Sequence, residues 1–251
     1  MTASLHHGTD IREAIARSAT GRQWFFDNAD FPWARAVEAR WAGLRAEVDK
    51  LLVAVDRLPG FEDIQHEQRQ LSTDRRWKIF PFHVYGHHFA RNSERCPQLA
   101  AAIGEIPRLR AAMLSILQAG KVLDPHEGPY NGVLRYHLGI VVPEPDRCGI
   151  TVGGETRRWE EGASLIFDDS HTHHAWNNGT RDRVVLFVDF DRPLPAPLAR
   201  RNETEIKRIS RSAFIMDAVD EWHRWEAQYG ADLDRQLAGE VAPGSANEAP
   251  R

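Results

Sequence analysis

The sequence predicts a mainly β protein, a barrel or sandwich of strands flanked by helices, and three observations support this fold class. Between residues 132 and 190, short runs of β-branched and aromatic residues alternate with turn residues. On either side of that region, apolar residues recur at steps of three and four, which is the spacing of a helix. A chain of 251 residues that is 42% hydrophobic can bury a substantial core. We therefore treat residues 1–251 as a single domain.

The N-terminal part, from about residue 10 to 120, is expected to be mainly helical. Residues 34–52 place apolar side chains every three or four positions and follow Pro32, a residue tolerated at a helix start. Residues 76–85 are the exception, since their aromatic and β-branched residues predict a strand, and Pro81 places that strand at an edge or a bulge. Two further segments are expected to be helical: residues 99–103 and 107–117.

The β core is expected at about residues 124–194. Helical spacing returns at residues 204–238. The two ends, residues 1 to about 9 and 240–251, are expected to be a loose tail and a disordered tail, because they are polar and contain few core-forming residues. The predicted strands of the core are residues 133–142, 151–152, 157–159, 164–167, 173–176 and 184–190.

Charge and composition argue against several classes of function. The net charge is −4 at pH 7, and the Lys and Arg residues are scattered, so neither nucleic acid nor anionic lipid is an expected partner. No apolar run reaches the roughly 18 residues that cross a bilayer, and the first residues lack the apolar stretch of a secretory signal. Two distant cysteines make no disulfide framework. We expect a cytoplasmic protein that binds a small-molecule substrate, and the sequence leaves its oligomeric state open.

The segment 133–142 is the first candidate for chemistry. Side chains alternate between the two faces of a strand, so Arg135, His137 and Gly139 share one face. The other face is almost wholly apolar and must pack on another layer. A lone histidine in such a strand is commonly a core residue that hydrogen-bonds to backbone, but an arginine beside it is costly to bury without a partner. This face is therefore a candidate interior site.

A second histidine cluster lies downstream, in the string DDSHTHHAWNN, and Trp176 follows it. Neutral imidazole is a good ligand for Fe, Zn, Cu or Ni. Alternation places His171 and His173 on one face and His174 on the other, so spacing does not choose among them. A surface location for the whole cluster also remains open.

Arg183 begins the apolar run RVVLFVDF. Its planar guanidinium can hold a carboxylate through two parallel hydrogen bonds. The alternative is an ordinary surface arginine at the end of a strand.

These strings together resemble one family. LRYHLGIVVP, GGETRRWEEGASLIFDDSHTHHAWNN and RVVLFVDFDRPL are similar to the aspartyl/asparaginyl β-hydroxylases, densely from about residue 134 to 194 and more loosely upstream. The resemblance implies a cupin-like double-stranded β-helix (jelly-roll) with flanking helices. It also implies Fe(II) as the metal, with 2-oxoglutarate and O₂ as co-substrates.

The resemblance also assigns residues. It makes His137 and His173 the metal ligands and Arg183 the anchor of the far carboxylate of 2-oxoglutarate, with His126 near the co-substrate. Gly139 stands where many related iron enzymes have a carboxylate ligand, and the family shares that glycine. One departure is Thr151, where the peptide hydroxylases have an arginine.

The expected function is hydroxylation of an unactivated C–H bond of a small molecule, an amino acid or a biosynthetic intermediate. The expected substrate contacts are Arg135, Thr151, His174, Trp176 and the aromatic segment 77–88. Four alternatives stay open: hydroxylation of peptidyl Asp or Asn, hydroxylation of a lipid acyl chain, a cupin-like binding protein without activity, and a cupin isomerase that uses Zn or Ni. The near-neutral charge disfavours the lipid.

Overall fold

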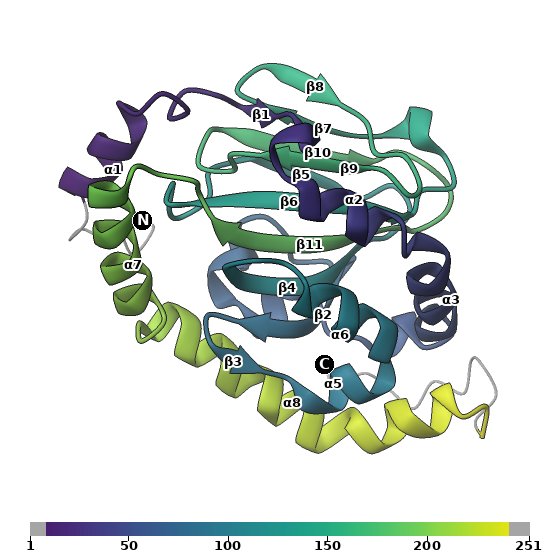
Figure 1. The fold of residues 1–251 in the computed structure, drawn as a ribbon. Helices are drawn as coiled ribbons and strands as arrows, with labels where there is room; N and C mark the ends of the chain where they lie inside the picture. Colours follow the sequence, from purple (N-terminus) through teal and green to yellow (C-terminus); the bar gives the residue numbers. More distant parts are fainter. Residues whose placement is uncertain (1–8, 241–251) are drawn as a thin grey trace.

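A computed structural model describes residues 9–240 of the chain. The predicted tails fall mainly on residues 1–8 and 241–251, outside the described part. Two antiparallel sheets form the body of the molecule, and their strand orders are β1-β9-β6-β11-β4-β2-β3 and β5-β10-β7-β8. In Figure 1 the four-stranded sheet lies against the part of the larger sheet that holds β9, β6 and β11. This is the double-stranded β-helix that the sequence predicts.

The strands of the larger sheet are β1 Phe25–Phe26, β2 Trp77–Val84, β3 His87–His88, β4 Leu109–Leu117, β6 Val133–Val141, β9 Ser164–Phe167 and β11 Arg183–Asp191. The strands of the smaller sheet are β5 Val122–His126, β7 Cys148–Val152, β8 Glu155–Arg157 and β10 His173–Asn177.

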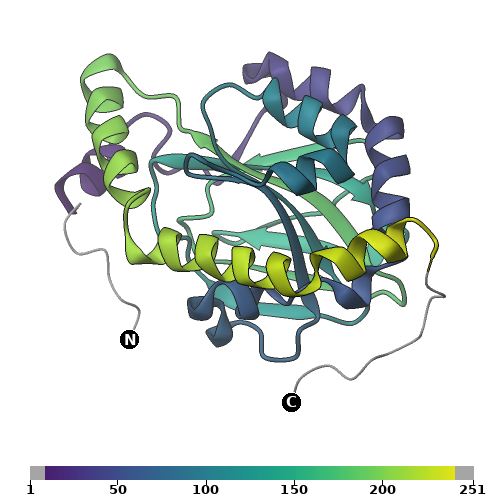
Figure 2. The same cartoon turned by 90° about the horizontal axis from the view of Figure 1, so that it is seen from below.

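Helices cover the outside of the larger sheet and the edge of the molecule. They are α1 Thr9–Ala16, α2 Pro32–Glu38, α3 Trp41–Leu52, α4 Phe61–Ile64, α5 Ala90–Arg95, α6 Pro97–Gly104, α7 Ala196–Ile209 and α8 Ala213–Leu237. Short 3-10 turns complete them: η1 Asn28–Asp30, η2 Val55–Arg57, η3 His66–Gln70 and η4 Pro145–Arg147. Figures 1 and 2 show α8 running past β2, β3 and β4. In the described part of the chain, no helix combines the length and apolar character that a bilayer crossing needs.

One predicted helix is wrong. Residues 107–117 are rich in Ala, Leu and Met, which favour helices, but the structure has the strand β4 there. β4 lies between β2 and β11, and its last seven residues are all buried. Burial on both faces removes the polar alternation that marks a strand in the sequence, so tertiary packing overrides the local preference. Because β2 and β4 are both interior strands of the larger sheet, the β core begins well before residue 124.

The remaining differences are at boundaries. The predicted helix at residues 34–52 is interrupted between α2 and α3, and the one at residues 204–238 is two helices, of which α7 begins earlier, at Ala196. β5 was not predicted, since it contains Pro125 at an edge of the smaller sheet. β6, β9, β10 and β11 lie where the alternating segments predict them.

Candidate active site

The inner face of the larger sheet holds the first site residues. In the register of β6 with β11, His137 lies opposite Phe187 and Arg135 opposite Asp189. The outer face of β6 packs on α2, where the Tyr136 ring lies 5.1 Å from that of Trp33. The predicted division of this strand into an interior polar face and a packed apolar face is therefore confirmed.

His137 is buried among aromatic rings. Its ring centroid lies 5.0 Å from that of Phe167, 5.2 Å from Phe187 and 5.9 Å from Trp159. Neither ring nitrogen has a hydrogen-bond partner, so His137 is not the backbone-bonded core histidine of the alternative interpretation. Burial, with Arg135 and Arg183 nearby, lowers the pKa of His137 well below its usual value. A buried neutral imidazole without a partner is suited to binding a metal ion.

His173 begins β10 in the smaller sheet and is 4% exposed. Its Nδ1 lies 3.0 Å from the carbonyl oxygen of His171. When Nδ1–H donates to that oxygen, the lone pair of Nε2 is available to a metal ion. Its ring packs on that of His126 from β5, with 4.1 Å between centroids. Burial, with His126 beside it, lowers the pKa of His173 to about 3, so this ring is also neutral near pH 7.

Gly139 leaves no room for a third ligand from β6. A Cβ atom at this position would lie 2.2 Å from the carbonyl oxygen of Glu160. Within residues 9–240, no group of three or more His, Cys, Asp or Glu side chains is arranged to hold a metal. The donor set present is thus two histidines, and it fits the two-histidine site that the resemblance implies.

Arg183 lies inside the fold and is 2% exposed, so it is not a surface arginine at a strand end. Its guanidinium carbon lies 4.5 Å from the centre of the Trp159 ring. It makes one long hydrogen bond, 3.4 Å from Nη1 to the carbonyl oxygen of Ser115, and its Nε has no partner. Burial lowers its pKa to about 10, so the group still carries its charge at neutral pH. A buried charge without a carboxylate is suited to an anionic ligand.

Trp159 was not singled out from the sequence. It is 1% exposed, lies beside both Arg183 and His137, and its indole Nε1 has no hydrogen-bond partner. The sequence predicts Trp159 at the end of a strand, residues 157–159, but β8 ends at Arg157 and Trp159 lies in a segment without regular structure, where strand alternation gives no orientation. The only available signal was its place in the string WEEG.

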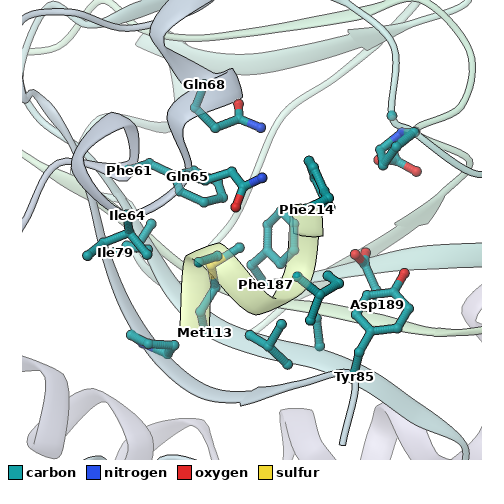
Figure 3. Close-up of a pocket in the computed structure, with 18 of the residues that line it drawn as sticks. Phe61, Ile64, Gln65, Gln68, Ile79, Tyr85, Met113, Phe187, Asp189 and Phe214 are labelled. Atoms are coloured by element: carbon teal, nitrogen blue, oxygen red, sulfur yellow. The ribbon is translucent and has the colours of Figure 1, made fainter. Parts of the chain in front are cut away.

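A cavity of about 160 Å³ opens beside His173. Figure 3 shows Tyr85 and Asp189 on one side of it and Phe61, Ile64 and Ile79 on the other, with Met113 and Phe187 between. α8 adds a further apolar wall, from Phe214 to Trp222. Gln65 and Gln68 add polar groups on the side of Phe61. The other polar residues of the lining include His126, Glu127, Arg135, Asp169 and Asp189. We call the group His126, Arg135, Asp169, Asp189 and Tyr85 the polar end of the cavity.

The charges of the polar end neutralise one another in part. Arg135 forms two hydrogen bonds to Asp189, at 2.8 and 2.9 Å, and its Nη1 lies 2.7 Å from Asp169. Burial alone would lower the pKa of Arg135, but the two carboxylates raise it. Burial raises the pKa of Asp169 to about 7, and its Oδ1 has no partner. Arg135 is therefore at the cavity, as expected, but is already bound to acids.

Three expected substrate contacts do not reach the cavity. Thr151 and His174 are cross-strand partners, the His174 ring stacks on Trp176 at 5.4 Å, and Trp176 covers Gly149. The hydroxyl of Thr151 lies 2.7 Å from that of Thr156. Since His173 faces inward, His174 and Trp176 face outward from β10, and Thr151 faces outward beside His174. The aromatic segment 77–88, in contrast, lines the cavity through Trp77, Ile79, Pro81, Val84 and Tyr85.

Known proteins are similar to this chain in sequence and in fold. An ornithine lipid ester-linked acyl 2-hydroxylase from Rhizobium tropici is 42% identical over 210 residues, which are 83% of this chain and 75% of that protein. The human aspartyl/asparaginyl beta-hydroxylase is 31% identical over 173 residues, 67% of this chain but 22% of that protein. A Cupin_2 domain from Enterobacter cloacae superposes with a TM-score of 0.34 over 47% of this chain and 99% of that chain, at 12% identity.

The match to the family itself covers most of the chain. Residues 38–193 match the family described as Aspartyl/Asparaginyl beta-hydroxylase. This range begins in α2 and contains His137, His173 and Arg183. The chain belongs to the aspartyl/asparaginyl β-hydroxylase family.

Proposed function

We propose that this protein is an Fe(II)- and 2-oxoglutarate-dependent hydroxylase that acts on a C–H bond of an acyl chain carried by a small amphiphile. The observation that carries the proposal is the pair His137 and His173, two buried neutral imidazoles, of which His137 has no partner for either ring nitrogen. Arg183 supplies the matching buried charge for a dicarboxylate.

Each residue has a distinct task in this proposal. His137 and His173 would hold Fe(II), and Gly139 supplies no third side-chain ligand from β6. Arg183 binds the far carboxylate of 2-oxoglutarate, and the N–H of Trp159 is available as a second donor. The rings of Phe167 and Phe187 exclude water around His137. When bound, Fe(II) with 2-oxoglutarate and O₂ supplies the oxidising power that inserts oxygen into the C–H bond.

The cavity favours an acyl chain over the free amino acid that the sequence suggested. Most of its lining is aliphatic or aromatic and it passes directly beside His173. A free amino acid would leave that apolar lining without a partner. The relative from Rhizobium tropici carries the name of an acyl hydroxylase and is similar over 83% of the chain, which supports the same choice.

The metal assignment is tested with three variants. His137→Ala and His173→Ala are expected to lose Fe(II) binding and succinate formation from 2-oxoglutarate. His174→Ala is the matched control, because His174 is adjacent in sequence but faces outward beside Trp176. Calorimetric metal titration and succinate release are the measurements. Full turnover in either of the first two variants would contradict the proposal.

The substrate assignment needs its own panel. Succinate release is measured with an acyl amphiphile, with free amino acids and with an Asp-containing peptide. We expect stimulation by the acyl compound alone, and product mass should increase by one oxygen. Stimulation by the peptide instead would assign the chain to the alternative of peptidyl hydroxylation.

A further inference from the structure

The polar end of the cavity adjoins an apolar lining, and acidic side chains outnumber basic ones in it. Arg135 is its only cation among the described residues that line the cavity, and it faces two acids, Asp169 and Asp189. Both acids are buried, at 1% and 7% exposure. A cavity that accepts a fatty chain would be expected to offer a free arginine to the chain's carboxylate, and this one does not.

Arg135 is already held by two acids and by an aromatic ring. Its Nε and Nη2 bind Asp189, and its Nη1 lies 2.7 Å from Asp169. One face of the guanidinium is covered by Phe187, whose ring centre lies 3.9 Å from the guanidinium carbon. The next arginine along the sheet, Arg110, is paired with Asp191 and Glu203. Within residues 9–240, every Lys or Arg that lines the cavity therefore has an acidic partner.

Asp169, in contrast, has an atom without a partner. Its Oδ1 is buried and makes no hydrogen bond, although its residue lines the cavity. The hydroxyl-bearing ring of Tyr85 lies beside Asp189 in Figure 3 and adds a neutral hydrogen-bonding group. With both acids ionised the three charged groups sum to −1, and with Asp169 protonated they sum to zero. In neither state does the polar end carry a positive charge.

We propose that the polar end binds an uncharged or cationic hydrogen-bonding group of the substrate, through Asp169, and rejects a free carboxylate. This inference rests on the proposed function, since it assumes an acyl chain in the apolar part of the cavity. The substrate is then an ester, an amide or an amine-bearing amphiphile, and not a free fatty acid.

The test compares three probes that share one ten-carbon chain: decylammonium, decanamide and decanoate. Their binding to the full chain is measured without metal or 2-oxoglutarate, by calorimetry and by intrinsic tryptophan fluorescence, to which Trp77 and Trp222 of the cavity lining contribute. We expect decanoate to bind at least about tenfold more weakly than the other two, because like charges across a desolvated contact repel strongly.

Variants locate the effect. Asp189→Asn releases Arg135 and should strengthen decanoate binding, and Asp169→Asn should weaken decylammonium binding. Asp217→Asn is the matched control, since Asp217 is exposed on α8. If all three probes bind the natural protein equally, this inference alone is overturned. The same holds if both cavity variants still bind decanoate as weakly, relative to the other probes, as the natural protein does. If none of the probes binds, the acyl-chain assignment fails and this inference fails with it.

Discussion

Two buried arginines of this molecule have opposite surroundings. Arg192, just after β11, is bound to the carboxylate of Asp168 and donates to the carbonyl oxygens of Asn131 and Thr20, at 2.8 and 3.0 Å. Arg183, at the start of the same strand, has one long contact to a carbonyl oxygen and an indole ring beside it. Both are at most 2% exposed.

The difference between the two arginines distinguishes a structural role from a ligand-binding role. The Arg192 pair fixes the loop that follows β9 and leads to His173, and all its partners belong to the protein itself. Burying Arg183 without a carboxylate opposes folding, and nothing within the described residues offsets it fully. A buried charge that the fold leaves unpaired indicates a ligand, whereas a paired one indicates a structural role.

The largest expected effect is on the paired arginine. Arg192→Met leaves the buried Asp168 without its counter-charge, so we expect a loss of about 3–5 kcal/mol in the free energy of unfolding. Urea denaturation followed by circular dichroism measures it. A loss below about 1 kcal/mol would mean that water replaces Arg192 and that the pair does not hold the loop.

A smaller effect is expected beside His137, one of the two proposed metal ligands. Gly139→Ala places a methyl group against the carbonyl oxygen of Glu160, at 2.2 Å before relaxation. The backbone must shift, at about 1–3 kcal/mol of unfolding free energy. Because the shift occurs two residues from His137, Fe(II) affinity should fall as well. Denaturation and metal titration of the same preparation check both outcomes, and unchanged metal affinity would contradict the second.

The unpaired arginine should behave in the opposite way to Arg192. Arg183→Met removes a buried charge that has no counter-ion, so we expect unfolding free energy within about 1 kcal/mol of the natural protein. 2-Oxoglutarate should raise the melting temperature of the natural protein and leave that of the variant unchanged. A destabilisation as large as that of Arg192→Met would erase the distinction between the two arginines.

The sequence predicted some of these features and could not predict others. Alternation in residues 133–142 placed Arg135 and His137 on the interior face, because a strand with one polar face carries that signal locally. It could not orient Trp159, which lies outside regular structure. The cavity also could not be predicted. β4 resembles a helix in composition, and α8, which forms part of the wall, is far from β4 in the sequence and reaches the cavity through tertiary packing alone. The partners of Arg135 and Arg192 depend on strand register, which the sequence does not reveal.

The smallest effect is expected at Thr151, where the peptide hydroxylases carry an arginine. Thr151 pairs with Thr156 across β7 and β8 and faces outward with His174. Thr151→Val removes only this partly exposed hydroxyl contact and keeps a β-branched side chain, so stability should change by less than about 0.5 kcal/mol. Succinate formation with an acyl substrate should also be unchanged, because the residue does not line the cavity. A several-fold rise in KM for that substrate would mean that the outer face of the smaller sheet takes part in binding. The hydrogen bond between Thr151 and Thr156 would then serve ligand binding, although both partners belong to the protein.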